Sequence, residues 1–412
     1  MAATQLMTTE QIRADFPTLR RQFNGRPVVF LDSGASSLKP KQVIQAEEDF
    51  YANHYANVHR GIYQLSEEAT DLFEGARERV AAFIGAPESR ELVLTRGTTE
   101  GLNLLAYSLG AQLAPGDEVV STVMEHHSNQ VPWQLLGRRR KTVLKHIGLD
   151  DEGYLKMEDL DRLVTDRTKI VTVTHVSNVL GTVNPIREIA EAAHDHGAVC
   201  IVDGAQSTPH MPVDVKALGC DFFAFSGHKM LGPTGVGGLW GRAELLEGME
   251  PFLGGGDMIS EVHLQESKWN QIPAKFEAGT PHIAGVIGLG AAVDYLSRIG
   301  MDWVQHHDEQ LIARAMARFA QMGDVRLLGP KDPRRHAGVL AFWLDYAHPH
   351  DVAQVFDDSA VCVRAGHHCA MPVNERYGVP ATTRASVYLY NDEGDIDRMF
   401  EAIEKVRRLF KP

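Results

Sequence analysis

The chain has 412 residues, with 41 Lys+Arg against 54 Asp+Glu and a formal net charge of −13. Its apolar fraction of 44% and charged fraction of 23% are ordinary for a globular protein, which argues against large-scale disorder, and the acidic surplus argues against nucleic acid as a partner. The start MAATQLMTTEQIRADF lacks the features of a signal peptide, and no apolar run approaches the ~20 residues of a membrane span, so we expect a cytoplasmic protein without a membrane partner.

Short apolar runs alternate with helix-length segments over the first two thirds of the chain. The predicted strands are residues 91–95, 118–122, 170–174, 198–202 and 222–225. The amphipathic segment 186–196 ends at Gly197, which is typical of a helix end that leads into the next strand. This alternation predicts an α/β fold with a mostly parallel sheet covered by helices on both faces.

The pattern changes after about residue 285. Two long helices, at roughly 286–299 and 302–322, precede extended runs at 339–344, 361–364 and 385–390, a helix near 350–358 and a final helix at 393–410. This order predicts a smaller α+β domain. The first 30 residues could belong to either unit. We assign residues 31–285 to a large domain, and residues 1–30 plus 286–412 to a small one.

Two motifs near the ends of predicted strands suggest a cofactor. Lys229 closes Ser226-Gly227-His228-Lys229 after the run 222–225, and it is either a surface lysine in a turn or an enclosed amine that forms a Schiff base. Asp203 ends the run 198–202, where ligand groups of parallel sheets gather, although it could simply cap a helix. Together they favour pyridoxal phosphate, whose ring nitrogen needs a carboxylate.

Two further segments fit the same cofactor. The turn at 96–101 (RGTTEG) opens a helix, so its amides and hydroxyls suit a phosphate, with Ser226 and His228 as additional donors; a simple capping turn is the alternative. In the segment 125–129 (EHHSN), His126 could stack on a flat ring or be a structural histidine. Adjacent histidines rarely converge on one ion, so we expect no metal.

The four cysteines differ in context. Three of them, Cys200, Cys220 and Cys362, lie in or beside apolar runs and are interpreted as packing residues. The sequence contains no CxxC pair, so we expect no structural zinc site. Cys369 lies in the loop 364–372 (RAGHHCAMP), where neighbouring histidines and Arg364 could stabilise a reactive thiolate.

These segments resemble one known family. VHRGIY, RGTTEG, MEHHSN, THVSNVLGT, VDGAQS, FSGHKMLGPTG, FEAGTP and RAGHHCAMP are similar to the group II (SufS-type) cysteine desulfurases, in the class V aminotransferase group of fold-type I pyridoxal phosphate enzymes. The resemblance runs from about residue 10 to the end of the chain. VDGAQ and SGHK mark only the superfamily, whereas RAGHHCAMP is specific. Gly34 departs from the alanine of many relatives.

The resemblance implies a seven-stranded, mostly parallel sheet and a role for each matching residue. Lys229 would bind the cofactor and move protons, Asp203 would pair with the ring nitrogen, Gln206 would contact the ring hydroxyl, and His126 would stack on the ring. Thr98, Ser226 and His228 would hold the phosphate, and Thr280 would reach in from the other subunit of a homodimer. Asn178 and Arg384 would bind the substrate carboxylate, Arg364 would support the cysteine loop, and His59 and Arg60 would approach the partner's site.

The implied reaction converts L-cysteine to L-alanine and leaves a persulfide on Cys369, which supplies sulfur for iron–sulfur cluster assembly in the SUF system. The sequence leaves open whether a SufE-type or a zinc-bearing SufU-type protein accepts the sulfur. Selenocysteine lyase or cysteine sulfinate desulfinase activity stays an alternative. A non-catalytic scaffold is the third hypothesis, and the presence of Lys229, Asp203 and Cys369 together argues against it.

Overall fold

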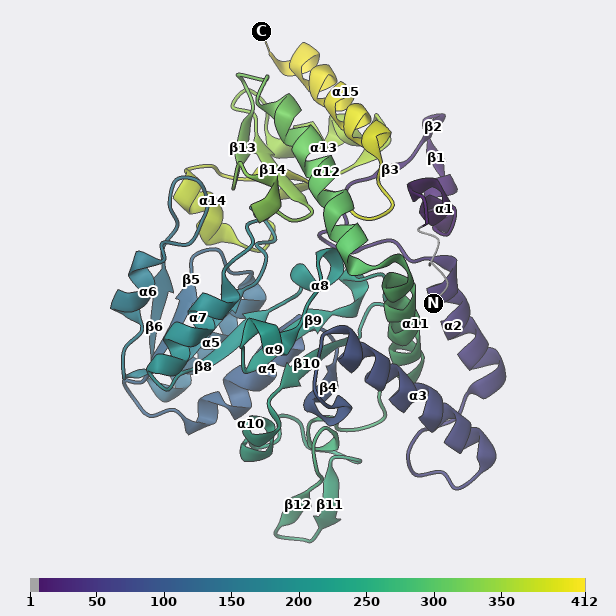
Figure 1. Ribbon diagram of the computed structural model, residues 1–412, viewed down its shortest axis with the longest axis vertical. Helices are drawn as coiled ribbons and strands as arrows, with labels where there is room; N and C mark the ends of the chain where they lie inside the picture. Colours follow the sequence, from purple (N-terminus) through teal and green to yellow (C-terminus); the bar gives the residue numbers. More distant parts are fainter. Residues whose placement is uncertain (1–6, 412) are drawn as a thin grey trace.

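The structure is a computed structural model that describes residues 7–411, so residues 1–6 of the predicted small domain and residue 412 lie outside it. Figure 1 shows two regions along the long axis of the molecule. A large sheet with its helices fills the lower part, and a smaller group of helices and strands lies above it.

The large sheet has the order β4-β10-β9-β8-β7-β5-β6. Its strands are β4 (Leu92–Thr95), β5 (Glu118–Thr122), β6 (Val143–Ile147), β7 (Thr168–Thr174), β8 (Val199–Asp203), β9 (Phe222–Ser226) and β10 (Gly237–Gly241). Only β10 is antiparallel to its neighbours, β4 and β9, among these strands. Every residue of β5, β9 and β10 is buried, as expected for a sheet covered on both faces. The fold prediction is confirmed.

Helices cover this sheet. The longer ones are α2 (Lys41–Asp49), α3 (Gln64–Phe83), α4 (Thr98–Ser108), α5 (Val131–Arg140), α7 (Ile186–Asp195) and α11 (Ile283–Ile299), and the shorter ones are α6 (Glu158–Leu163), α8 (Ser207–His210), α9 (Val215–Leu218) and α10 (Ala243–Gly248). Helix α7 buries Ile186, Ile189, Ala190 and Ala193 on one face. It is followed by Gly197 with φ +69°, the left-handed turn that the sequence predicts.

The second sheet has four antiparallel strands in the order β13-β14-β17-β16. Its strands are β13 (Arg326–Leu328), β14 (Val339–Trp343), β16 (Arg364–Gly366) and β17 (Thr382–Ser386), and its region also holds α12 (Met301–Phe319), α13 (Pro349–Asp357), α14 (Met371–Tyr377) and α15 (Glu393–Phe410). Two expectations need correction here. The predicted run 385–390 is mostly loop, because β17 ends at Ser386 and Tyr390 beyond it bonds Ser33 and the backbone of Leu38 instead of a neighbouring strand. The predicted run 361–364 divides between β15 (Val361–Cys362) and β16.

Residues 29–32 lie against the C-terminal part of the chain. Strand β3 (Val29–Phe30) pairs with β15, and Asp32 forms a bridge to Ser386. The structure also has α1 (Thr9–Arg13), the hairpins β1 (Gln22–Phe23)–β2 (Arg26–Pro27) and β11 (Ile259–Val262)–β12 (Ser267–Trp269), and several short 3₁₀ or π turns; the hairpin β11–β12 projects from the lower end in Figure 1. The predicted division at residues 285 and 286 falls inside α11, which packs on α2 and α3. The domain boundaries stay a prediction.

Between residues 7 and 411, no single helix is long and apolar enough to cross a membrane. Helices α11 and α12 pass that test only as a pair, across a bend of 74°.

Candidate active site

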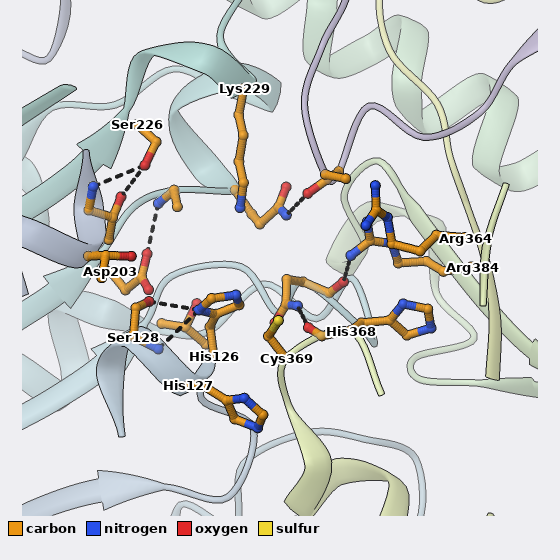
Figure 2. A pocket seen from close by; sticks show the side chains of 18 of the residues that line it. His126, His127, Ser128, Asp203, Ser226, Lys229, Arg364, His368, Cys369 and Arg384 are labelled. Atoms are coloured by element: carbon orange, nitrogen blue, oxygen red, sulfur yellow. Dashed lines mark hydrogen bonds between the residues drawn. The ribbon is translucent and has the colours of Figure 1, made fainter. Parts of the chain in front are cut away.

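A cavity of about 530 Å³ lies between the two sheets, at the carboxyl ends of β5, β7, β8 and β9. It collects most of the predicted site residues, and Figure 2 shows Lys229 and Cys369 on opposite sides of it. The predicted residues that line it are Thr98, His126, Asn178, Asp203, Gln206, Ser226, His228, Lys229, Arg364, Cys369 and Arg384. The topology explains this convergence, since the loops that follow parallel strands meet at one edge of a sheet.

Lys229 follows β9 in a short 3₁₀ turn. Gly227 makes the turn possible, because a Cβ there would lie 2.8 Å from the carbonyl oxygen of Val236. Burial lowers the pKa of Lys229 to about 8; the charge of Asp203 opposes this and that of Arg384 adds to it. A substantial fraction of the amine is therefore neutral near neutral pH and able to act as a base or a nucleophile.

Asp203, the last residue of β8, and Gln206, three residues later, both line the cavity. Asp203 is 3% exposed, and its Oδ1 accepts a hydrogen bond of 3.0 Å from the backbone N–H of Ala205. Burial raises the pKa of Asp203, and the charge of Lys229 opposes this rise. Gln206 Nε2 donates to the carbonyl oxygen of Gly34 at 2.8 Å, whereas its buried Oε1 has no partner in the described part of the chain. That oxygen is free to accept a hydrogen bond from a ligand.

The turn between β4 and α4 forms a cradle. Gly97 has φ +126°, which favours glycine, and Thr98 begins the helix. The backbone N–H of Thr98 donates to Ser226 Oγ at 3.0 Å, and the two hydroxyls lie 2.9 Å apart. Burial, together with the charge of Lys229, lowers the pKa of His228 to about 4, so this ring is neutral. Helix amides and hydroxyls in this arrangement suit a phosphate dianion.

His126 has a fixed ring. Its Nδ1 accepts the backbone N–H of Ser128 at 3.1 Å and lies 2.7 Å from the hydroxyl of the same residue. Burial and then the charge of Lys229 lower the pKa of His126 to about 3. The ring is therefore neutral with its proton on Nε2, as a ring that stacks on a cationic pyridine requires.

The cysteine loop joins β16 to α14 in a strained conformation. His368 and Cys369 both have positive φ, at +51° and +56°. Asn178 Nδ2 donates to the carbonyl oxygen of His368 at 2.5 Å, and the backbone N–H of His127 donates to that of Cys369 at 2.7 Å. The backbone N–H of Met371 in turn donates to His127 Nε2 at 3.3 Å. Groups of the large sheet thus hold the loop that presents the thiol.

The other cysteines have a different environment. Cys200 and Cys220 are buried, Cys362 is half-buried, and Cys369 is exposed. Burial raises the pKa of each of the first three thiols. This agrees with the packing roles predicted for them and leaves Cys369 as the accessible thiol.

Two arginines that line the cavity, Arg364 and Arg384, share the carboxylate of Asp32. Arg364 donates to both oxygens of Asp32, at 3.1 and 2.8 Å. Arg384 is 3% exposed, its Nη1 donates to the carbonyl oxygen of Asn178 at 3.0 Å, and its Nη2 lies 3.5 Å from Asp32. Within residues 7–411, Nε and Nη2 of Arg384 make no hydrogen bond. The cluster holds one net positive charge with free donors, which suits a carboxylate ligand.

Sequence reasoning missed three residues of this site. Asp32 pairs with both arginines, and His127 holds the cysteine loop. Glu125 is fully buried and accepts hydrogen bonds from Thr122 Oγ1, Asn129 Nδ2 and the backbone N–H of Thr174. Burial raises the pKa of Glu125 to about 8, against the effect of these three donors. The available signal was position alone, because Glu125 and His127 flank His126 in EHHSN.

The residues of the cavity fit pyridoxal 5′-phosphate. The cavity offers a buried carboxylate (Asp203) for the ring nitrogen and, within the described residues, an unpartnered acceptor (Gln206 Oε1) for the ring hydroxyl. It also offers the Thr98–Ser226 cradle for the phosphate and an amine of lowered pKa (Lys229) for the aldehyde. Three of the predicted site residues do not line this cavity. Thr280 lines a second cavity of about 370 Å³, and His59 and Arg60 line a third of about 370 Å³.

Comparison with known proteins identifies the family. The profile of the class-V aminotransferases matches residues 29–399. The chain is 50% identical over 405 residues to a probable cysteine desulfurase of Halalkalibacterium halodurans, which covers 98% of this chain and 99% of that protein. It is 49% identical over 402 residues to a cysteine desulfurase of Dickeya dadantii, with 97% of each chain covered.

Solved structures agree. A cysteine desulfurase from Thermococcus onnurineus, solved in its apo form, superposes with a TM-score of 0.94 at 40% identity over the whole of both chains. The cysteine desulfurase CsdA from Escherichia coli gives 0.91 at 36% identity, over 98% of this chain and 100% of that one. The family is dependent on pyridoxal phosphate, which the cavity fits. The chain therefore belongs to the class-V aminotransferase family and, within it, to the cysteine desulfurases.

Proposed function

We propose that this protein converts L-cysteine to L-alanine and carries the released sulfur as a persulfide on Cys369. The observation that carries the proposal is the arrangement of one cavity. A lysine amine of lowered pKa and an exposed loop thiol face each other across it, beside an arginine with unpartnered donors.

The residues divide the work of binding. Arg384 would take the substrate carboxylate on its free Nε and Nη2 donors, and Asn178, which already holds the backbone of His368, lies beside it. Asp203 would hold the ring nitrogen of the cofactor, and the Thr98–Ser226 cradle its phosphate. When bound, pyridoxal phosphate supplies the electron sink that stabilises negative charge at the substrate Cα.

Lys229 would move protons, and His126 would support it. The neutral amine of Lys229 would remove the Cα proton and return a proton to the product. His126 stays neutral with its proton on Nε2, so in the same cavity it would stack on the cofactor ring and donate a hydrogen bond.

Sulfur transfer is a displacement between two sulfur atoms. The Cys369 thiolate attacks the substrate Sγ, a new S–S bond forms, and the substrate C–S bond breaks with its electron pair moving to carbon. Carbon is reduced and takes up protons to become the methyl group of alanine. The two sulfurs are left as a persulfide on Cys369, so L-cysteine and the free enzyme thiol become L-alanine and the persulfide.

We also propose a homodimer that supplies a SUF-type iron–sulfur assembly system in the cytoplasm through a SufE-type or SufU-type acceptor. The position of Thr280, His59 and Arg60 supports the dimer, because they line other cavities and would be available to a second subunit. The exposed position of Cys369 supports delivery to an acceptor protein.

The test measures alanine and sulfide from L-cysteine with the cofactor-loaded protein. Cys369→Ala should lose desulfuration while it keeps the visible absorbance of the bound cofactor, and Cys362→Ala, a half-buried thiol outside the cavity, is the matched control. Full turnover by Cys369→Ala would refute the assignment. Selenocysteine and cysteine sulfinate, assayed beside L-cysteine, test the side activity, since they need less from the thiol.

A further inference from the structure

A buried ion-pair network lies along β4, the strand that leads into the phosphate cradle. Its centre is Arg77, on α3, whose side chain is 3% exposed. Nη1 and Nη2 donate to the two carboxylate oxygens of Glu277 at 2.6 and 2.8 Å, and Nε donates to Glu74 at 2.8 Å. Burial lowers the pKa of Arg77, and the charges of Glu277 and Glu74 outweigh this and raise it. The guanidinium is therefore charged and held in one geometry.

The pair Arg77–Glu277 completes the edge of the large sheet. Strand β4 is the last strand on its side, and its other edge pairs with β10. On the outer edge, Arg77 Nη1 donates to the carbonyl oxygen of Leu92 at 3.0 Å, and the backbone N–H of Leu94 donates to Glu277 Oε1 at 2.7 Å. Leu92 and Leu94 point their backbone groups to the same side. The two side chains thus replace the N–H and C=O of an absent neighbouring strand.

This edge leads directly into the cradle. Leu94 lies three residues before Gly97 and four before Thr98, whose backbone N–H meets Ser226. The register of β4 sets where Thr98 stands relative to Ser226, because Thr95 pairs with Gly237, which also pairs with Ser226 across β10. Without the bonds to Arg77 and Glu277, the end of β4 would be hydrogen-bonded only to β10.

The same network reaches the segments predicted to serve the partner's site. Glu277 lies three residues before Thr280, and Glu74 Oε1 lies 2.8 Å from His59 Nε2. His59 has φ +73°, an unfavourable conformation for a histidine, and its ring packs edge-on against Phe73. One guanidinium therefore ties together the phosphate turn and both of these segments.

We infer that Arg77 and Glu277 are positioning residues for cofactor phosphate: by acting as the missing edge partner of β4, they hold the Thr98 turn in the register that binds the dianion. The inference rests on the proposed placement of the phosphate at Thr98 and Ser226, and it does not depend on which sulfur chemistry follows.

The test compares two ligands of the apoprotein, pyridoxal phosphate and pyridoxal, which lacks the phosphate. The dissociation constant of pyridoxal divided by that of pyridoxal phosphate isolates the phosphate contribution, because a purely structural loss would weaken both ligands alike and leave this ratio unchanged. The double variant Arg77→Leu/Glu277→Leu removes both charges, which avoids an unpaired buried ion, but leaves Leu92 and Leu94 without partners. We expect its ratio to fall by about tenfold, as for loss of well-made hydrogen bonds to an anion.

The control is Arg90→Leu/Glu247→Leu, an ion pair of 3.1 Å near the start of β4 whose side chains are 48% and 57% exposed. Its ratio should match that of the unmodified protein. If the double variant does not fold, Glu277→Ala replaces it, because Leu94 then loses its acceptor while Arg77 keeps Glu74 as its partner. An unchanged ratio in the folded variant, equal weakening of both ligands, or the same fall in the control would overturn the inference. If the unmodified protein prefers pyridoxal phosphate to pyridoxal but does not turn over L-cysteine, that result would instead count against the proposed function.

Discussion

The pKa of Lys229 gives a quantitative prediction about the apoprotein. Burial lowers it from the ordinary 10.5 to about 8. At pH 7, a pKa near 8 leaves ~10% of the amine neutral, against ~0.03% at 10.5, which is a difference of about 300-fold in reactive amine. Because only the neutral amine attacks an aldehyde, the rate of covalent attachment of pyridoxal phosphate should rise about tenfold per pH unit and level off near pH 8.

The assay follows the absorbance of the linked cofactor after apoprotein and pyridoxal phosphate are mixed, at pH values from 6 to 10. Two variants test the sign of the nearby charges. Asp203 raises the pKa of Lys229 and Arg384 lowers it, so Asp203→Asn should move the plateau to lower pH and Arg384→Gln to higher pH. Arg376→Gln, whose partner Asp151 lies outside the cavity, is the control. A rate that still climbs above pH 9 would refute the reasoning.

Three further predictions concern the residues around the cavity. Asp203→Asn should slow exchange of the Cα proton of L-alanine with deuterium, seen by NMR, because the ring nitrogen loses its buried carboxylate; an unchanged exchange rate would remove Asp203 from the mechanism. Glu125→Gln should lower the free energy of urea unfolding by ~1–3 kcal/mol, since one carboxyl oxygen becomes an amide nitrogen that faces another donor, either Asn129 Nδ2 or the N–H of Thr174, and unchanged stability would contradict the network. Asn178→Ala should speed alkylation of Cys369 by iodoacetamide, because the strained loop loses its bond at His368; equal rates would show that Asn178 does not hold the loop.

The sequence predicted the parts of the fold that depend on local pattern. Strand β5 and helix α15 begin and end where the apolar periodicity places them, and Gly197 makes the predicted turn. The prediction of a strand at 385–390 was wrong because Tyr390 makes a tertiary contact with Ser33, more than 350 positions earlier in the chain. Apolar character alone does not distinguish a strand from a buried loop.

The candidate site shows the same division. Asp203 and Lys229 were predicted because each follows a recognisable strand, and the carboxyl ends of parallel strands meet. The role of Asp32 was not predicted, because it depends on a pairing with Arg364 and Arg384, which lie more than 300 positions later in the chain. The edge formed by Arg77 and Glu277 joins residues 200 positions apart and has no local signature.

Cys369 is the residue proposed to receive the substrate sulfur. The most direct measurement is peptide mass spectrometry of the cofactor-loaded protein after exposure to L-cysteine without reductant. We predict that the peptide with Cys369 becomes heavier by one sulfur atom, that alanine forms in equal amount, and that the peptides with Cys200, Cys220 and Cys362 keep their masses. Added sulfur on another cysteine, or alanine formed while the Cys369 peptide stays unmodified, would contradict the account.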